Sequence, residues 1–127
     1  MSIMALTKIE IITRSSKLDE LKDALNSIGV LGMTVSQVFG CGLQKGHQEV
    51  YRGRTYDINL VPKIKVETIV CDVPVEKVLE TAQKVLRTGQ FGDGKIFVTE
   101  LKDAVRIRTG QRGDEAIRDI PGEVPER

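Results

Sequence analysis

The order of apolar repeats places the strongest limit on the fold, because two strand–helix–strand patterns follow one another along the chain. Residues Thr7 to Thr13 alternate as a strand does, with Ile9 and Ile11 on one face. Leucines and isoleucines at helical spacing run from Leu18 to Ile28, and the β-branched run Thr34 to Val38 then predicts a second strand. The first half of the chain is therefore predicted to form a strand, a helix and a strand.

Two side chains before the first predicted helix resemble a helix N-terminal capping pair. Ser16 is followed three positions later by Asp19, and oxygens at this spacing can accept hydrogen bonds from the free N–H groups of a first turn. Gly29 is well placed to end the same helix.

The second half of the chain repeats the pattern. Lys63 to Cys71 alternates strictly, with Ile64, Val66, Thr68 and Val70 on one face. Asp72 and Pro74 mark the turn into a second helix, and Lys95 to Leu101 predicts the fourth strand. The apolar stripe of that helix is formed by Val75, Val78, Leu79, Ala82, Val85 and Leu86, before Gly89. The whole order predicts an α+β, ferredoxin-like β-α-β-β-α-β sandwich with both helices on one face of an antiparallel sheet.

The other face of such a sheet has no cover from the chain itself. Apolar positions on it, Ile12 and Ile69 among them, would meet water unless another chain covers them. Because monomers rarely expose large apolar patches, we expect self-association, and a closed ring of three copies would turn three such faces inward.

A long polar segment, residues 40–62, separates the second and third predicted strands. It is punctuated by glycines and carries both tyrosines. Loops of this length are usually functional or disordered. We expect residues 1–117 to form a single domain that presents this loop. The segment from Gln111 is rich in glycine, proline and charge and is expected to be mobile, with residues 118–127 as a tail.

Composition excludes several functions. The net charge of +1 gives no basic excess for nucleic acid, and the absence of tryptophan with only 4% aromatic residues argues against a base-stacking surface. No apolar run approaches the roughly 20 residues that span a bilayer, and no signal peptide is recognisable. Two cysteines do not make a disulfide framework. We therefore expect a cytoplasmic protein.

Three features favour binding of an anion. The segment Gly40-Cys41-Gly42 could let a ligand approach the backbone closely, although a flexible hinge is the commoner role of such glycines. The segment Thr88 to Lys95 could cradle a phosphate with Lys95 as the cation, or could be a plain helix-to-strand turn. Val105 to Arg108 is predicted to be extended, which places Arg106 and Arg108 on one side, where paired guanidinium groups suit phosphate oxygens or form a solvated edge.

Other candidate residues carry weaker signals. His47 has no second ligand at metal-binding spacing and is expected to face solvent. Cys71 is expected to be a buried apolar side chain, and no neighbour of Cys41 in the sequence indicates a reactive thiol. No arrangement of serine, histidine and aspartate or of cysteine and histidine indicates a nucleophilic enzyme.

Four motifs in order carry a resemblance to a known family: GCGLQKGHQEVYRGRTY, VPKIKVE, RTGQFGDGKIFV and VRIRTGQRGDEAI. They closely resemble the PII nitrogen-regulatory signal proteins, of the type that partners ammonium transporters. The resemblance runs from Lys8 to Ile117. It implies a homotrimer that binds ATP or ADP competitively in clefts between subunits, with magnesium and 2-oxoglutarate beside ATP, and a long loop that docks onto target proteins.

The resemblance also assigns roles to residues. Nucleotide contacts would come from Thr34, Gly42, Leu43, Ile69, Gly92, Asp93, Gly94, Lys95 and Ile107, and from Arg106 and Arg108 of a neighbouring subunit. Gln44 would ligate magnesium and help hold 2-oxoglutarate, whose distal carboxylate would pair with Lys63. Tyr56 matches a tyrosine that is uridylylated in some relatives, and Tyr51, Arg52 and Arg54 would contact the partner.

The chain departs from the family pattern at two places that bear on ligand affinity. Leu43 stands where many relatives have an arginine that contacts the nucleotide phosphates, and Arg14-Ser15-Ser16 replaces the usual Lys-Pro-Phe. The implied function is a non-enzymatic cytoplasmic sensor that regulates an ammonium transporter or an enzyme of nitrogen metabolism, with recruitment to the membrane through a transporter. The alternatives are a slow ATP hydrolase, for which Glu67 is a possible base, and a PII-like carboxylate or metal sensor with another target.

Overall fold

The computed structural model describes residues 5–41, 49–51, 54–56 and 60–118 of the 127-residue chain. Its centre is an antiparallel sheet in the order β2-β5-β1-β6. The four strands are β1 (Leu6–Arg14), β2 (Thr34–Cys41), β5 (Leu60–Val70) and β6 (Lys95–Leu101). The order confirms the predicted ferredoxin-like topology, in which the first and third predicted strands lie at the centre of the sheet.

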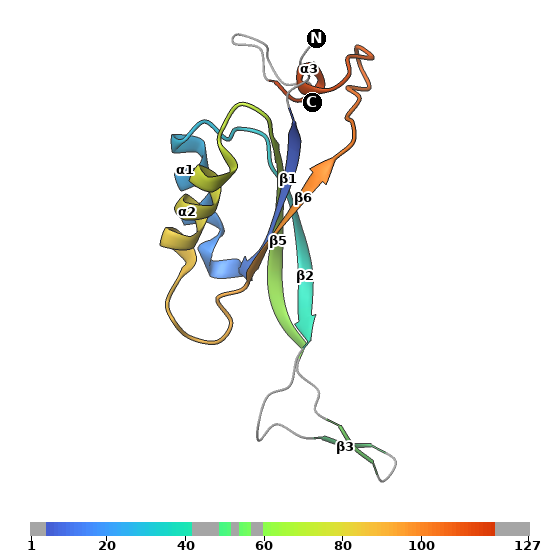
Figure 1. The fold of residues 1–127 in the computed structure, drawn as a ribbon. Helices are drawn as coiled ribbons and strands as arrows, with labels where there is room; N and C mark the ends of the chain where they lie inside the picture. Colours follow the sequence, from blue (N-terminus) through green and yellow to red (C-terminus); the bar gives the residue numbers. More distant parts are fainter. Residues whose placement is uncertain (1–4, 42–48, 52–53, 57–59, 119–127) are drawn as a thin grey trace.

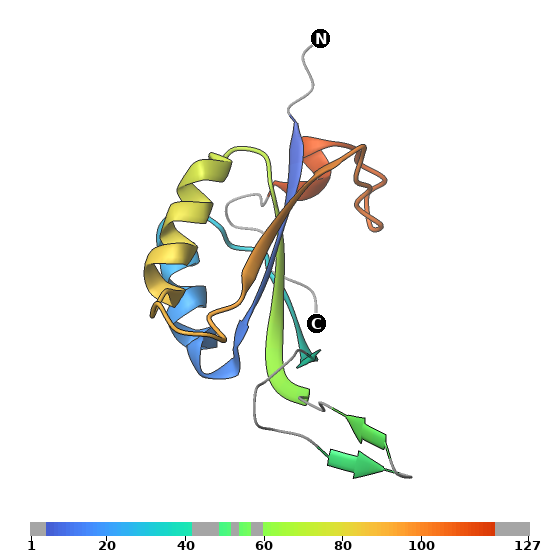
Figure 2. The same cartoon turned by 60° about the horizontal axis from the view of Figure 1, so that its bottom comes forward.

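Two helices cover one face of this sheet (Figures 1 and 2). They are α1 (Leu18–Ser27), which follows the short 3-10 helix η1 (Ser15–Lys17), and α2 (Val75–Leu86). Their apolar faces supply Leu21 and Leu25 from α1 and Val78, Ala82 and Leu86 from α2, all of which are buried. Each helix thus buries the stripe that its sequence spacing predicts.

The sheet contributes every second residue to the same core. Ile9 and Ile11 of β1 and Val66 of β5 are at most 1% exposed, and Ile64 and Val70 join them. Burying an aliphatic side chain of this kind stabilises a fold by about 1.5–3 kcal/mol. The strict alternation of the third predicted strand is therefore confirmed as the pattern of one buried face.

The strands on either side of the long loop extend further into it than predicted. β2 continues to Cys41 and β5 begins at Leu60, because the two strands remain paired through Phe39↔Pro62, Gly40↔Val61 and Cys41↔Leu60. Between them a short hairpin pairs β3 (Glu49–Tyr51) with β4 (Arg54–Tyr56). In Figure 2 this hairpin lies beyond the end of the four-stranded sheet.

Other local predictions were wrong. The first helix has no side-chain cap, because residues 15–17 form the 3-10 turn η1 instead of a Ser16 capping pair. Residues 105–108 are not an extended segment: Val105 makes an isolated bridge to Arg112, and a turn follows in which the Gly110 amide donates to the Arg106 carbonyl at 2.7 Å. Within the segment from Gln111, a one-turn helix forms, α3 (Asp114–Ile117). Cys71 is only half-buried, because it lies at the end of β5 where the chain leaves the core.

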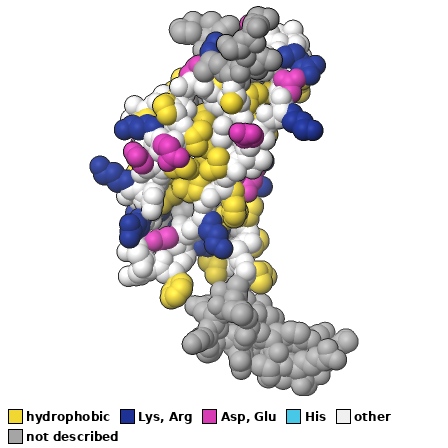
Figure 3. All heavy atoms as spheres, viewed as in Figure 1, with side chains coloured by type: hydrophobic (Ala, Val, Ile, Leu, Met, Phe, Trp, Pro, Cys, Tyr) yellow, Lys and Arg dark blue, Asp and Glu magenta, His cyan; other side chains and the backbone are white. Residues whose placement is uncertain are grey.

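The face of the sheet away from the helices carries both apolar and charged side chains. Ile12 and Ile69 are half-buried there, as are four charged side chains on the two central strands. These charges alternate, and the Lys65 ammonium lies 3.4 Å from the Glu67 carboxylate and 3.9 Å from that of Glu10. Figure 3, which has the same view as Figure 1, shows hydrophobic side chains along the middle of this side of the molecule, with charged side chains on either side of them.

The described part of the chain contains neither a membrane-spanning helix nor a cluster of metal ligands. No helix there has the length and apolar character needed to cross a membrane. Within the same residues, no group of three or more histidine, cysteine, aspartate or glutamate side chains is arranged to hold a metal ion.

Candidate functional site

The described site residues gather at the two ends of the sheet. Thr34 and Ile69 lie where β2 begins and β5 ends, whereas Gly92 and Lys95 lie where β6 begins. Along β5 the step from Lys63 to Ile69 is about 20 Å at the usual rise of a strand. Figure 1 shows the two ends apart, with α3 at one of them and the link from α2 to β6 at the other. In one copy of the chain the predicted contacts therefore do not form one continuous site.

The first end contains an open hollow of about 640 Å³. This volume lies in the range of pockets for small molecules. Its lining includes Thr34, Ile69 and Arg106, three of the predicted nucleotide contacts, together with Glu67. Arg106 thus lines the same hollow as Thr34 and Ile69 within one chain, whereas the resemblance implied that it would come from a neighbouring subunit. The walls come from the link between α1 and β2, the end of β5, and residues 116–118. The hollow thus combines apolar side chains with a guanidinium group, as a site for a flat ring system that carries an anion would require.

Arg106 is held in this hollow by the backbone of the C-terminal segment. Its Nε donates to the carbonyl oxygen of Ala116 at 3.3 Å, and its Nη2 donates to the carbonyl oxygen of Arg118 at 2.6 Å. The Arg118 guanidinium in turn binds Asp72, because its Nε and Nη2 each donate a hydrogen bond of 2.9 Å to a carboxylate oxygen of Asp72. The hydrogen bonds from Arg118 lower the pKa of Asp72 below its ordinary value.

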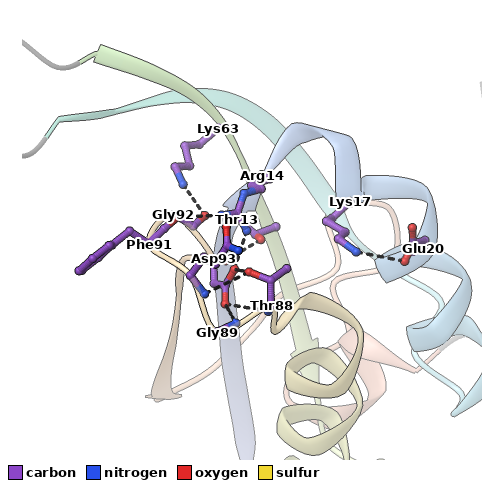
Figure 4. A network of polar contacts seen from close by, with 11 residues as sticks. Thr13, Arg14, Lys17, Glu20, Lys63, Thr88, Gly89, Phe91, Gly92 and Asp93 are labelled. Atoms are coloured by element: carbon purple, nitrogen blue, oxygen red, sulfur yellow. Dashed lines mark hydrogen bonds and ion pairs between the residues drawn. The ribbon is translucent and has the colours of Figure 1, made fainter. Parts of the chain in front are cut away.

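The second end is a tight turn, residues 88–94, organised around the carboxylate of Asp93 (Figure 4). Asp93 accepts hydrogen bonds from the Thr88 hydroxyl at 2.5 Å and from the Thr88 and Gly89 amides at 2.8 and 2.9 Å. Arg14 donates to the same carboxylate at 2.5 Å and to the Phe91 carbonyl at 2.7 Å. The Thr88 hydroxyl, then Arg14, and the turn amides hold the pKa of Asp93 far below its ordinary value.

This turn also packs closely against β1. Gly94 has a φ of +103°, and a Cβ added there would lie 1.8 Å from the carbonyl oxygen of Ile12. Thr13 fastens the same point, because its hydroxyl donates to the Asp93 carbonyl at 2.8 Å. Only glycine fits a left-handed backbone in so close a contact. A smaller hollow of about 360 Å³ beside the turn is lined in part by Gly94 and Lys95.

Lys63 connects the base of the long loop to the turn. Its Nζ donates to the Gly92 carbonyl at 2.7 Å, and its stem lies beneath Gly40, where an added Cβ would be 3.5 Å from Lys63 Cγ. Figure 4 shows Lys63 and Arg14 reaching toward the same turn, Lys63 to Gly92 and Arg14 to Asp93. The two cations therefore hold the turn from β5 and from β1.

Several expected contacts cannot be placed. Gly42, Leu43, Gln44, His47 and Arg52 lie outside the described residues, and Tyr51, Arg54 and Tyr56 are described only by the backbone of β3 and β4. Ile107 and Arg108, which follow Arg106 in the turn, are both exposed.

Sequence reasoning missed the two carboxylate–guanidinium pairs that shape both ends. Arg14 and Asp93 are 79 positions apart, and Asp72 and Arg118 are 46 apart, so no local spacing relates them. Asp93 was singled out, but as a ligand contact, whereas its carboxylate is directed into the turn. Its place between two glycines was the one signal that indicated a special backbone.

The fold and its two polar ends define a small ferredoxin-like domain suited to bind an anionic ligand. A family model described as nitrogen regulatory protein P-II matches residues 6–111. The nitrogen regulatory protein P-II of Rhodospirillum rubrum is 50% identical over 110 residues, which cover 87% of this chain and 98% of that protein. The chain belongs to the nitrogen regulatory protein P-II family.

Solved structures give the same result. The structure titled as the Bacillus subtilis GlnK–ATP complex matches with a TM-score of 0.76 and 44% identity, covering 91% of this chain and 99% of that one. The Arabidopsis thaliana PII protein bound to citrate matches with a TM-score of 0.72 and 37% identity, covering 89% and 92%. The Bacillus protein thus has ATP bound, and the plant protein has a tricarboxylate.

Proposed function

We propose that this P-II family protein is a nucleotide-responsive regulator that binds ATP or ADP between the subunits of a homotrimer. The observation that carries the proposal is the division of the predicted contacts between the two ends of the sheet. The glycine turn of one copy supplies backbone groups and Lys95 for the phosphates, and the hollow of the next copy supplies Thr34, Ile69 and Arg106. A closed ring joins unlike ends of identical chains in this way.

The residues present fit a nucleotide. The turn is fixed before any ligand arrives, because Asp93, Arg14 and Lys63 hold its backbone through the hydrogen bonds described above. The hollow offers an apolar wall and the Arg106 guanidinium, whose fork suits phosphate oxygens. ATP in a related GlnK protein of known structure supports the assignment of the ligand.

The long loop is proposed to be the output of this site. Gln44 would ligate magnesium and, with Lys63, hold 2-oxoglutarate, and citrate in a plant relative supports a carboxylate ligand of this family. Lys63 already links the base of the loop to Gly92, so a carboxylate that draws Lys63 away would alter both segments. A ligand shifts a conformational equilibrium only by binding the two states differently.

The proposed partner of the loop is an ammonium transporter or an enzyme of nitrogen metabolism. Tyr51, Arg52 and Arg54 would make the contact, and Tyr56 is a candidate for modification. We place the protein in the cytoplasm, with recruitment to the membrane through a transporter.

An ATP hydrolase is the main rival. Partial burial opposes the shift, but the Lys65 and Lys8 ammonium groups together lower the pKa of Glu67. A carboxylate stabilised in its charged form is a weaker general base. The regulator is therefore favoured over the enzyme.

Calorimetry tests the proposal. We expect heat on titration with ATP and with ADP, competition between the two, and tighter 2-oxoglutarate binding when ATP and magnesium are present. Light scattering should give the mass of three chains. The absence of heat with either nucleotide would overturn the proposal, and steady phosphate release above about one turnover per minute would favour the hydrolase.

A further inference from the structure

The C-terminal segment carries a contact that the family match does not include. The family model ends at residue 111, whereas α3 and Arg118 lie beyond it. Arg118 nevertheless lines the hollow, together with Asp72 and Arg106. The segment after the family match therefore forms part of the wall of the candidate site.

The contacts of Arg118 form a chain that leads to Arg106. The Arg118 side chain makes two parallel hydrogen bonds to Asp72, and its Nη1 lies 3.2 Å from the Asp114 carboxylate. Its main-chain amide donates to the Asp114 carbonyl at 2.9 Å, which closes the end of α3. Its carbonyl, like that of Ala116, accepts a hydrogen bond from the Arg106 guanidinium. The side chain of Arg118 thus fixes the carbonyls on which Arg106 rests.

The opposite end of the segment is fastened separately. Asp103, which follows β6, accepts hydrogen bonds from the guanidinium of Arg112 and from the Gly113 amide at 3.1 Å. Gly113 also donates to the Ala104 carbonyl at 3.0 Å. Loss of the Asp72 contact would therefore free the last turn of the segment while its beginning stays attached.

The pair between Arg118 and Asp72 is exposed enough to break without unfolding the domain. The two side chains are 43% and 53% exposed, and neither belongs to the buried core. Exposed ion pairs contribute little to global stability. Two parallel bonds between a guanidinium and a carboxylate do fix an orientation, however. Such a pair is suited to position a segment more than to hold up the fold.

We propose that Arg118, through its pair with Asp72, is a positioning residue that orients the Arg106 guanidinium for an anionic ligand in the hollow. The inference rests on the proposed function, since it assigns the affinity for that ligand to a contact beyond the family match. The orientation is set in advance, because two carbonyls occupy Nε and Nη2 of Arg106 and fix the plane of its guanidinium. A guanidinium that is already oriented loses less conformational freedom when a ligand binds.

Calorimetric titration with ATP of Arg118→Gln and of Asp72→Asn tests the inference. Each should weaken binding about fivefold to tenfold, roughly 1 kcal/mol. Lys84→Gln is the matched control, because Lys84 is an exposed cation on α2 that lines neither hollow, and it should bind as wild type. The charge-swapped double variant Asp72→Arg with Arg118→Asp should recover part of the loss.

Two further measurements separate positioning from a general structural effect. In an Arg106→Gln background, Arg118→Gln should cause no further loss, because residues that act through one another are not additive. Without any ligand, Arg118→Gln should speed hydrogen exchange at the main-chain amide of position 118, which donates to the Asp114 carbonyl. The exchange of the β1 amides should stay unchanged.

The outcomes are distinguishable. If wild type gives no heat with ATP, the proposed function fails, and hydrogen exchange still reports whether Arg118 fixes the segment. If wild type binds ATP and Arg118→Gln binds equally well or more tightly, the positioning inference alone is overturned. Unchanged exchange, or equal losses in the wild-type and Arg106→Gln backgrounds, would also overturn it.

Discussion

The two ends of the sheet use the same kind of contact for different purposes. At the turn of residues 88–94 a guanidinium pairs with Asp93, whose side chain is 22% exposed, and amides and a hydroxyl of the turn bind the same carboxylate. At the hollow a guanidinium pairs with Asp72, whose side chain is 53% exposed. The Asp93 carboxylate fixes the backbone of its own turn, whereas the Asp72 carboxylate binds Arg118, 46 positions away in the sequence. The environment of an ion pair, more than its geometry, thus decides whether it stabilises the fold or adjusts a site.

The largest expected effect is at the close contact of the turn with β1. Gly94→Ala should lower the free energy of unfolding by about 3 kcal/mol or more, because a left-handed backbone and a collision with the Ile12 carbonyl add together. Gly89→Ala is the control: it has a φ of +86° but open space around it, and should cost about 1 kcal/mol. Equal losses in urea unfolding would show that the contact with Ile12 is not the cause.

The next effect concerns the dependence of stability on pH. The folded pKa of Asp93 is depressed, so its contribution is fully present above the pKa of an unfolded aspartate, about 3.9, and is lost as pH falls toward the folded value. Asp93→Asn should therefore lower the melting temperature at pH 7, and the difference from wild type should narrow below about pH 4. A constant difference between pH 7 and pH 3 would contradict this explanation.

A smaller effect is expected from the cation that holds the turn. Arg14→Lys keeps the charge but cannot reach both Asp93 and the Phe91 carbonyl, so the backbone around Gly92 should loosen. We expect ATP binding to weaken about threefold to tenfold by calorimetry. Lys17→Gln removes a partly exposed ion pair with Glu20, 3.5 Å away, and serves as the control. If the two variants bind ATP equally well, the turn does not depend on the fork of Arg14.

The smallest effect on stability should come from the pair between Asp72 and Arg118. Asp72→Asn should leave the melting temperature close to that of wild type, since the pair is exposed and lies outside the core. The comparison of the two ends predicts a clearly larger loss for Asp93→Asn when both are measured by calorimetric unfolding at pH 7. A larger loss for Asp72→Asn than for Asp93→Asn would contradict the distinction between a pair that stabilises the fold and a pair that positions a segment.

Much of the fold could be predicted from the sequence because its elements carry regular apolar periods. The alternation of Lys63 to Cys71 and the stripe from Val75 to Leu86 gave the buried faces of β5 and α2. The predicted capping pair at the first helix was wrong, because the chain forms a 3-10 turn at residues 15–17 where local capping was expected. The prediction that Val105 to Arg108 is extended was wrong, because hydrogen bonds of Arg106 to residues 110 and 111 outweighed the β propensity of the segment.

The candidate site was only partly predictable. Its glycines and arginines were recognisable as residue types and through the family resemblance. The pairs that position them join residues dozens of positions apart, and only the folded chain brings them together. The division of the contacts between two ends was likewise not visible in the sequence, because it follows from the length of β5 and the order of the strands.

Complementation between two defective variants tests the central claim most directly. Lys95→Gln should weaken the turn end and Arg106→Gln the hollow end, so each variant alone should bind ATP far more weakly than wild type. The two variants are co-expressed in equal amounts and assemble at random. A site is intact only when its turn comes from the Arg106→Gln chain and its hollow comes from the Lys95→Gln chain. About one quarter of the wild-type sites should therefore be recovered. Recovery of that capacity at wild-type affinity is the result we predict. No recovery in mixed assemblies of confirmed composition would contradict a site shared between two copies of the chain.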